Sequence, residues 1–226
     1  MLLTKAWLET RWRLLFTAAM LAAVMALTFA NSNPRARNAR DLWGFAAMLA
    51  TGALQLAGSG VKSQSPAGFP EGLAGSTQFT ISLPVSRLRL LTVRAAFGMA
   101  ETAALNAIVL SAAWSRMPWI RGVGTPMDFA RLIVATSITL LLPYCASMLF
   151  GTILDEPFSM VLAGWALVPL LWLLHRAAPA VDILRIWGAA SPLVTHALPW
   201  PQTGACAGLA AMLFWAAARI VQRREY

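Results

Sequence analysis

Residues 132–154 read LIVATSITLLLPYCASMLFGTIL, and this apolar run contains no charged side chain. A helix of that length crosses the roughly 30 Å hydrocarbon core of a lipid bilayer. All backbone polar groups inside the membrane must be paired, because lipid offers them no hydrogen-bonding partner, and a helix meets this demand by itself. The run therefore predicts a transmembrane helix. The same criterion, a predominantly apolar block of about 20 residues, is applied to the rest of the chain.

The same criterion finds five further apolar blocks, at residues 14–30, 43–60, 90–114, 158–174 and 204–221. The chain is 58% hydrophobic and only 12% charged, whereas soluble domains average about 25% charged residues. The sequence thus predicts an all-α fold, a polytopic transmembrane helical bundle of about six spans. It forms a single domain over residues 1–226, with both termini on the same side. The sixth span requires the Arg219 side chain to reach back to the membrane surface.

The segment before the first span, residues 1–13, has the pattern of an interfacial helix lying on the membrane surface. Charged residues recur every four positions and tryptophans suit the headgroup region, at Lys5, Glu9, Arg13, Trp7 and Trp12. The alternative is that this segment is only the end of the first span. No cleaved signal peptide is expected, because no short apolar core precedes a small-residue cleavage site.

The net charge of +9 would point to nucleic acid as a partner if the protein were soluble. Here the basic residues flank apolar blocks, a placement that suits anionic lipid headgroups. Membrane lipids are therefore expected partners and nucleic acid is not. If the termini are cytoplasmic, ten of the 18 basic residues lie on that side, which favours this orientation only weakly.

The segment GSGVKS at residues 58–63 superficially resembles a phosphate-binding loop. That loop needs Lys directly after its second glycine, so that backbone N–H groups and the ammonium converge on phosphates. Val61 separates Gly60 from Lys62, and no strand precedes the segment. The chain is therefore not expected to bind ATP itself.

Catalytic and metal-binding patterns are not apparent in the sequence. An intramembrane hydrolase would need His175 or His196 next to a nucleophile such as Ser59, which the expected topology places on the opposite side. This hydrolase is the least favoured alternative. Cys145 and Cys206 lie in apolar stretches and are expected to be small buried side chains. We predict no catalytic residues, no metal site, no cofactor bound by this chain, and hence no enzyme.

The connection between the fifth and sixth spans, residues 176–203, contains four prolines. Even so, Val181, Leu184 and Trp187 keep helical spacing, with Asp182 on the opposite face. The pattern predicts one short interfacial or re-entrant helix.

Glu101 lies inside the third predicted span, seven residues after Arg94 and therefore on the same helix face. A carboxylate inside the membrane is energetically expensive and should face other helices or a polar cavity. Two interpretations stay open: a residue of a pathway or conformational change, or an ion-paired structural carboxylate.

A loop rich in Gly, Ser and Pro, residues 61–77, leads from the second span into a more structured segment. Ser76 can cap a short helix, Pro84 ends it, and Ser86 can cap the third span. The sequence predicts a small helix outside the membrane, immediately before a span.

This segment combines a Gly-Ser step, an apolar run, Leu-Pro-Val-Ser-Arg and a further basic residue, at Gly75-Ser76, Phe79, Ile81, residues 83–87 and Arg89. In this pattern the chain resembles the permease subunits of bacterial ABC-2 type ABC transporters. The surface helix, six spans and long excursion before the sixth span agree in outline. The long Ser-, Pro- and Gly-rich lead at residues 61–74 departs from the family pattern.

The resemblance implies a cytoplasmic coupling helix at residues 76–83 that docks in a separate ABC ATPase subunit, which binds ATP and Mg²⁺. The ATPase-coupling residues it implies are Ser76, Thr77, Phe79, Ile81, Leu83, Pro84, Ser86 and Arg87. It further implies a second permease copy or homologue, a place in the cell inner membrane with both termini cytoplasmic, and export of an unidentified substrate. A membrane anchor or sensor-like protein without transport activity stays open as an alternative.

Overall fold

The computed structural model describes residues 11, 14–26, 40–57, 86–116, 118–154 and 159–223, and every regular element among them is helical. After an N-terminal helix, Leu14–Ala26, the order is α2 (Arg40–Ala57), α4 (Arg87–Arg116), α5 (Pro118–Val123), α6 (Pro126–Ile153), α7 (Ser159–Ala177), the 3-10 helices η2 (Pro179–Val181) and η3 (Ile183–Trp187), α8 (Pro192–Thr195) and α9 (Trp200–Arg223). The all-α prediction is confirmed for these ranges.

A helix lies at each of the six predicted apolar blocks. Three helices are long and apolar enough to cross a membrane, namely Leu88–Arg116, Pro126–Ile153 and Trp200–Arg223. The other apolar helices are shorter within the described ranges, at Leu14–Ala26, Ala46–Ala57 and Leu162–Ala177. The three long helices indicate a membrane protein.

α6 begins at Pro126, earlier than the start near residue 132 expected from the apolar run. Thr125 is the N-cap: its hydroxyl accepts from the backbone N–H of Asp128, whose carboxylate accepts from the backbone N–H of Thr125. This capping box and the proline at the first turn fix the helix start. Apolar length alone underestimates the helix, because its first turn is polar.

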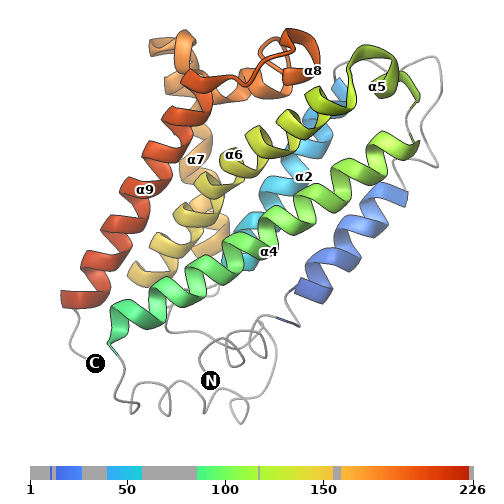
Figure 1. Ribbon diagram of the computed structural model, residues 1–226. Coiled ribbons are helices and arrows are strands. Elements are labelled where there is room, and N and C mark those ends of the chain that lie inside the picture. The colour runs from blue at the N-terminus through green and yellow to red at the C-terminus, as the bar shows by residue number, and fades with distance from the viewer. Residues whose placement is uncertain are drawn as a thin grey trace.

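α6 occupies the centre of the bundle (Figure 1). It packs against α2, α4, α7 and α9, and also against α8 and η3. Its buried side chains include Leu132, Leu140, Tyr144 and Met148. A helix that is apolar on all sides is suited to such a central position.

The connection between α7 and α9, residues 178–199, forms a cap at one end of the bundle, the end where α5 also lies (Figure 1). The prediction of one short helix is wrong, because η2, η3 and α8 occupy this stretch. In a 3-10 helix residues three apart share a face, so Ile183 and Ile186 are buried together. Asp182, expected on the polar face, is also buried.

Large apolar side chains project outward from the bundle. On α7, Trp165 is 77% exposed and Val168 is 68% exposed, and on α9 Met212 and Trp215 are exposed. Large apolar side chains exposed in such number are costly in water, whereas lipid accepts them. The Arg219 guanidinium lies 5.1 Å from the centre of the Trp215 ring, close enough for a cation–π interaction.

Candidate functional site: polar groups inside the bundle and beneath the cap

Most of the predicted ATPase-coupling residues lie outside the described part of the chain, as does nearly all of the expected interfacial helix 1–13. The residues concerned are Ser76, Thr77, Phe79, Ile81, Leu83 and Pro84. Ser86 and Arg87 are described. The Ser86 hydroxyl accepts from the backbone N–H of Arg89 at 3.3 Å, so the prediction that Ser86 caps this helix is confirmed.

Glu101 lies in the interior of the bundle, on α4, with 7% of its surface exposed. One turn before it, Gly98 faces Tyr144 of α6. A Cβ atom at position 98 would lie 2.8 Å from Tyr144 Cζ and 2.9 Å from Cε2. Glycine therefore leaves room for the Tyr144 ring of α6 against α4, one turn from the buried carboxyl group.

Asn106, two turns further along α4, joins the same two helices through its amide. Its Nδ2 lies 2.9 Å from Thr136 Oγ1, 2.9 Å from Ser137 Oγ and 3.2 Å from the Ile133 carbonyl oxygen, all on α6. Asn106 is fully buried, and within the described ranges its Oδ1 accepts no hydrogen bond. Buried acceptors without partners are uncommon in folded proteins. No sequence signal distinguished this residue.

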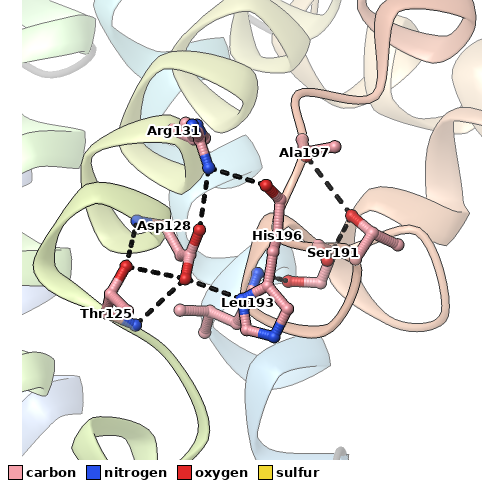
Figure 2. Close-up of polar contacts among 8 residues, drawn as sticks. Thr125, Asp128, Arg131, Ser191, Leu193, His196 and Ala197 are labelled. Carbon is pink, nitrogen blue, oxygen red and sulfur yellow. Dashed lines mark hydrogen bonds and ion pairs between the residues drawn. The ribbon is translucent and has the colours of Figure 1, made fainter.

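Asp128 is the centre of a second polar cluster, which joins α6 to the cap (Figure 2). Its Oδ2 accepts from the Thr125 hydroxyl at 2.8 Å and lies 2.7 Å from His196 Nδ1. Its Oδ1 accepts from Arg131 Nη1 at 2.9 Å. The same Arg131 nitrogen donates to the His196 carbonyl oxygen at 2.6 Å. One buried carboxylate thus organises both the start of α6 and the attachment of α8.

His196 follows α8 as its C-cap residue and has a left-handed backbone conformation, with φ of 53°. Glycine usually occupies this position, because a side chain there costs roughly 1–2 kcal/mol. Here the histidine ring reaches Asp128 and the carbonyl group reaches Arg131. These contacts explain why a residue with a side chain occupies a position that favours glycine.

Leu193 of α8 completes the attachment by apolar packing. It is 3% exposed, and its Cδ2 atom would lie 2.9 Å from a Cβ atom at position 124. Gly124, which lies between α5 and α6, therefore leaves the space that Leu193 fills. The Leu193 side chain lies next to the hydrogen bonds of Asp128 (Figure 2).

A separate His–Asp pair holds the η2–η3 half of the cap. His175 Nδ1, at the end of α7, lies 2.7 Å from Asp182 Oδ2, and Asp182 Oδ1 accepts from the backbone N–H of Leu184. Gln202 of α9 donates to the Ala180 carbonyl oxygen at 3.0 Å. The two halves of the cap are therefore attached to different helices.

Both histidines are bonded through Nδ1 to a buried carboxylate, an arrangement that also orients catalytic bases. In the described ranges, however, no serine, threonine or cysteine side chain is hydrogen-bonded to either ring. Those ranges also contain no group of three His, Cys, Asp or Glu residues placed to hold a metal ion. Cys145 and Cys206 are buried free thiols, as expected from the sequence. What the structure shows of both pairs is that they attach parts of the cap to the helices.

No family model, curated protein or solved structure matches this chain.

Proposed function

We propose that this chain is the membrane-spanning permease subunit of an ATP-driven ABC exporter. The observation that carries the proposal is the junction at α4: the Leu-Pro-Val-Ser-Arg run ends where this helix begins, with Ser86 as its cap and Arg87 as its first residue. An ATPase bound to the segment before this junction would act directly on the start of α4, because the two adjoin in the sequence.

α4 is suited to carry such a movement into the bundle. It continues for 30 residues and packs against α2, α6 and α9. The close approach at Gly98 and the hydrogen bonds of Asn106 tie it to α6. A tilt of α4 would therefore move α6 as well, and α6 carries the attachment of the cap.

In the proposed transporter the three shorter apolar helices also cross the membrane, which gives six spans. Both termini then lie in the cytoplasm, and the cap lies on the opposite face of the inner membrane. A separate ABC ATPase binds ATP and Mg²⁺ and hydrolyses the nucleotide, so this chain is not itself an enzyme. A second permease chain completes the assembly. The exposed tryptophans of α7 and α9 support contact with lipid.

Aspartate at position 79 or 83 is expected to abolish association with the ATPase while membrane insertion is unchanged. Phe79→Asp and Leu83→Asp would each place an unpaired charge in an apolar contact, a loss of at least about tenfold in affinity. Co-purification of a tagged ATPase with each variant measures the effect. Ala67→Asp, in the preceding polar loop, is the matched control and should associate normally.

Normal association of both variants would refute the coupling-helix assignment. A chain that co-purifies with no ATPase, and stimulates none, would instead favour the alternative of a membrane anchor or sensor.

Glu101→Gln is expected to reduce stimulation of the ATPase by the permease in nanodiscs, with no loss of folded protein. A carboxylate buried within a span is expensive, and such groups are characteristic of transport pathways. Thr102→Val is the control, because the hydroxyl of Thr102 bonds to the Gly98 carbonyl oxygen of its own helix. ATP hydrolysis equal to wild type in Glu101→Gln would reduce Glu101 to a structural role.

A further inference from the structure

The α8 half of the cap, residues 191–197, has several hydrogen bonds within itself. The Ser191 hydroxyl accepts from the backbone N–H of Leu193, and the Ser191 carbonyl oxygen accepts from the N–H groups of Val194 and Thr195. The backbone N–H of His196 donates to the Pro192 carbonyl oxygen. We call this segment the α8 flap.

Few groups hold the flap against α6, and most of them meet at one carboxylate. Asp128 contacts the His196 ring, and Arg131 links Asp128 to the His196 carbonyl oxygen. The apolar contacts are those of Leu193, packed over Gly124, and of Pro192, which is fully buried. The loss of the His196 contacts would remove the polar part of the attachment in one step and leave only this apolar packing.

The remainder of the cap is attached elsewhere. Asp182 bonds to His175 of α7, and Gln202 of α9 bonds to the Ala180 carbonyl oxygen. Ile186 and Trp187 of η3 are buried in the core. Gly188 and two alanines separate η3 from the flap. The backbone N–H of Ala190 donates to the Arg185 carbonyl oxygen, and that of Ser191 donates to the Gly188 carbonyl oxygen. A movement of the flap with η2 and η3 in place would therefore bend the chain at residues 188–191.

The left-handed conformation of His196 is a separate observation that also points to a switch. Strained backbone persists only where surrounding contacts enforce it, and it is concentrated at clamps and switch regions. At this residue the enforcing contacts are the same ones that hold the flap to α6. Release of the flap would remove the contacts and the strain together.

We propose that residues 191–197 form a hinged flap, fastened to α6 through Asp128 and His196, which opens as a unit while η2 and η3 remain fixed. Its participation in export, as a gate on the face opposite the ATPase, rests on the proposed function. The opening of the flap does not rest on the proposed function. The opening and the gating role can therefore be tested separately.

The test is the rate at which a water-soluble maleimide modifies a Leu193→Cys variant in nanodiscs. Leu193 is 3% exposed, so labelling requires the flap to open. Adding Asp128→Asn should raise the rate by about tenfold or more, because hydrogen bonds to a charged group are lost. Adding Asp182→Asn, which loosens only the other half of the cap, should leave the rate within about twofold.

Two further variants separate flap opening from misfolding. Val194→Cys lies at a position that is 58% exposed, so its labelling rate should be the same with and without Asp128→Asn. His196→Asn keeps a residue that tolerates the left-handed conformation but shortens the side chain that reaches Asp128. It should accelerate labelling of Leu193→Cys as well. Wild type, whose two cysteines are buried, gives the background.

The flap proposal would be refuted if neither Asp128→Asn nor His196→Asn changed the labelling rate of Leu193→Cys. It would also be refuted if Asp182→Asn raised that rate as much as Asp128→Asn does. Labelling of Leu193→Cys in the complex with the ATPase, with ATP against ADP, then tests the link to export. A rate that depends on ATP would support that link. A rate independent of nucleotide, with acceleration by Asp128→Asn retained, would overturn the gating role and leave the flap established.

Discussion

Gly98→Leu is expected to lose most of its folded protein in detergent, with a cost of about 3 kcal/mol, at the upper end for overpacked interiors. Even the first carbon of a side chain at position 98 would lie 2.8 Å from Tyr144 Cζ. Tyr144 is 3% exposed, so its ring would have to shift within the packed interior or the two helices would have to separate. The thermal unfolding midpoint and the monodisperse fraction in size-exclusion chromatography measure the effect.

Alanine at position 98 isolates the steric part of this cost. In a helix interior Gly→Ala normally stabilises by about 1 kcal/mol, so a lower unfolding midpoint in Gly98→Ala reports the clash directly. Gly208→Ala is the matched control, because a Cβ atom there would meet nothing within 4 Å, and it should be neutral or stabilising. Recovery in the double variant Gly98→Ala/Tyr144→Leu would assign the cost to this pair. An unfolding midpoint equal to wild type in Gly98→Leu would contradict the close contact between α4 and α6.

Block length and local capping were the features that sequence could predict. The apolar blocks marked the positions of six helices, and the Ser86 cap followed from a serine directly before an apolar run. The Thr-x-x-Asp pattern at residues 125–128 is also a local signal, which a search for capping boxes would have found. Such features depend on residues within one or two turns of each other.

Contacts between distant segments were not predictable in the same way. Asp128 and His196 are 68 positions apart, and they meet only because the cap folds back onto the start of α6. The irregular cap hid this relation, since 3-10 turns replaced the helix expected from apolar spacing. Asn106 gave no signal either, because an amide in an apolar span has the same appearance in sequence whether it faces lipid or a neighbouring helix.

Asn106→Asp is expected to be the most damaging conservative substitution in the bundle, at about 3–5 kcal/mol, the cost of a buried charge without a partner. The two side chains have nearly the same shape. The amide donates toward oxygen atoms of Ile133, Thr136 and Ser137, whereas a carboxylate would place negative charge against the Ile133 carbonyl oxygen. The thermal unfolding midpoint and the yield of folded protein from membranes measure the effect.

Asn106→Leu is the control, since it removes the same hydrogen bonds without adding charge. Hydrogen bonds between helices in a membrane contribute about 0.6 kcal/mol on average and at most about 1.7. The hydroxyls of Thr136 and Ser137 can also bond to carbonyl groups of their own helix, as Thr136 already does with Leu132 at 2.8 Å. Leucine should therefore cost much less than aspartate.

The difference in stability between these two variants also reports whether water reaches the space between α4 and α6. A charge is costly there only if water cannot reach it. The Oδ1 atom of Asn106, buried and without a donor among the described residues, is where water would be expected first if any entered. If Asn106→Asp proved as stable as Asn106→Leu, water would reach this position, and the α4–α6 seam at Asn106 would become the candidate for the transport pathway. A large difference would instead establish a dry seam that transmits movement between the two helices, the role that the proposed function requires of it.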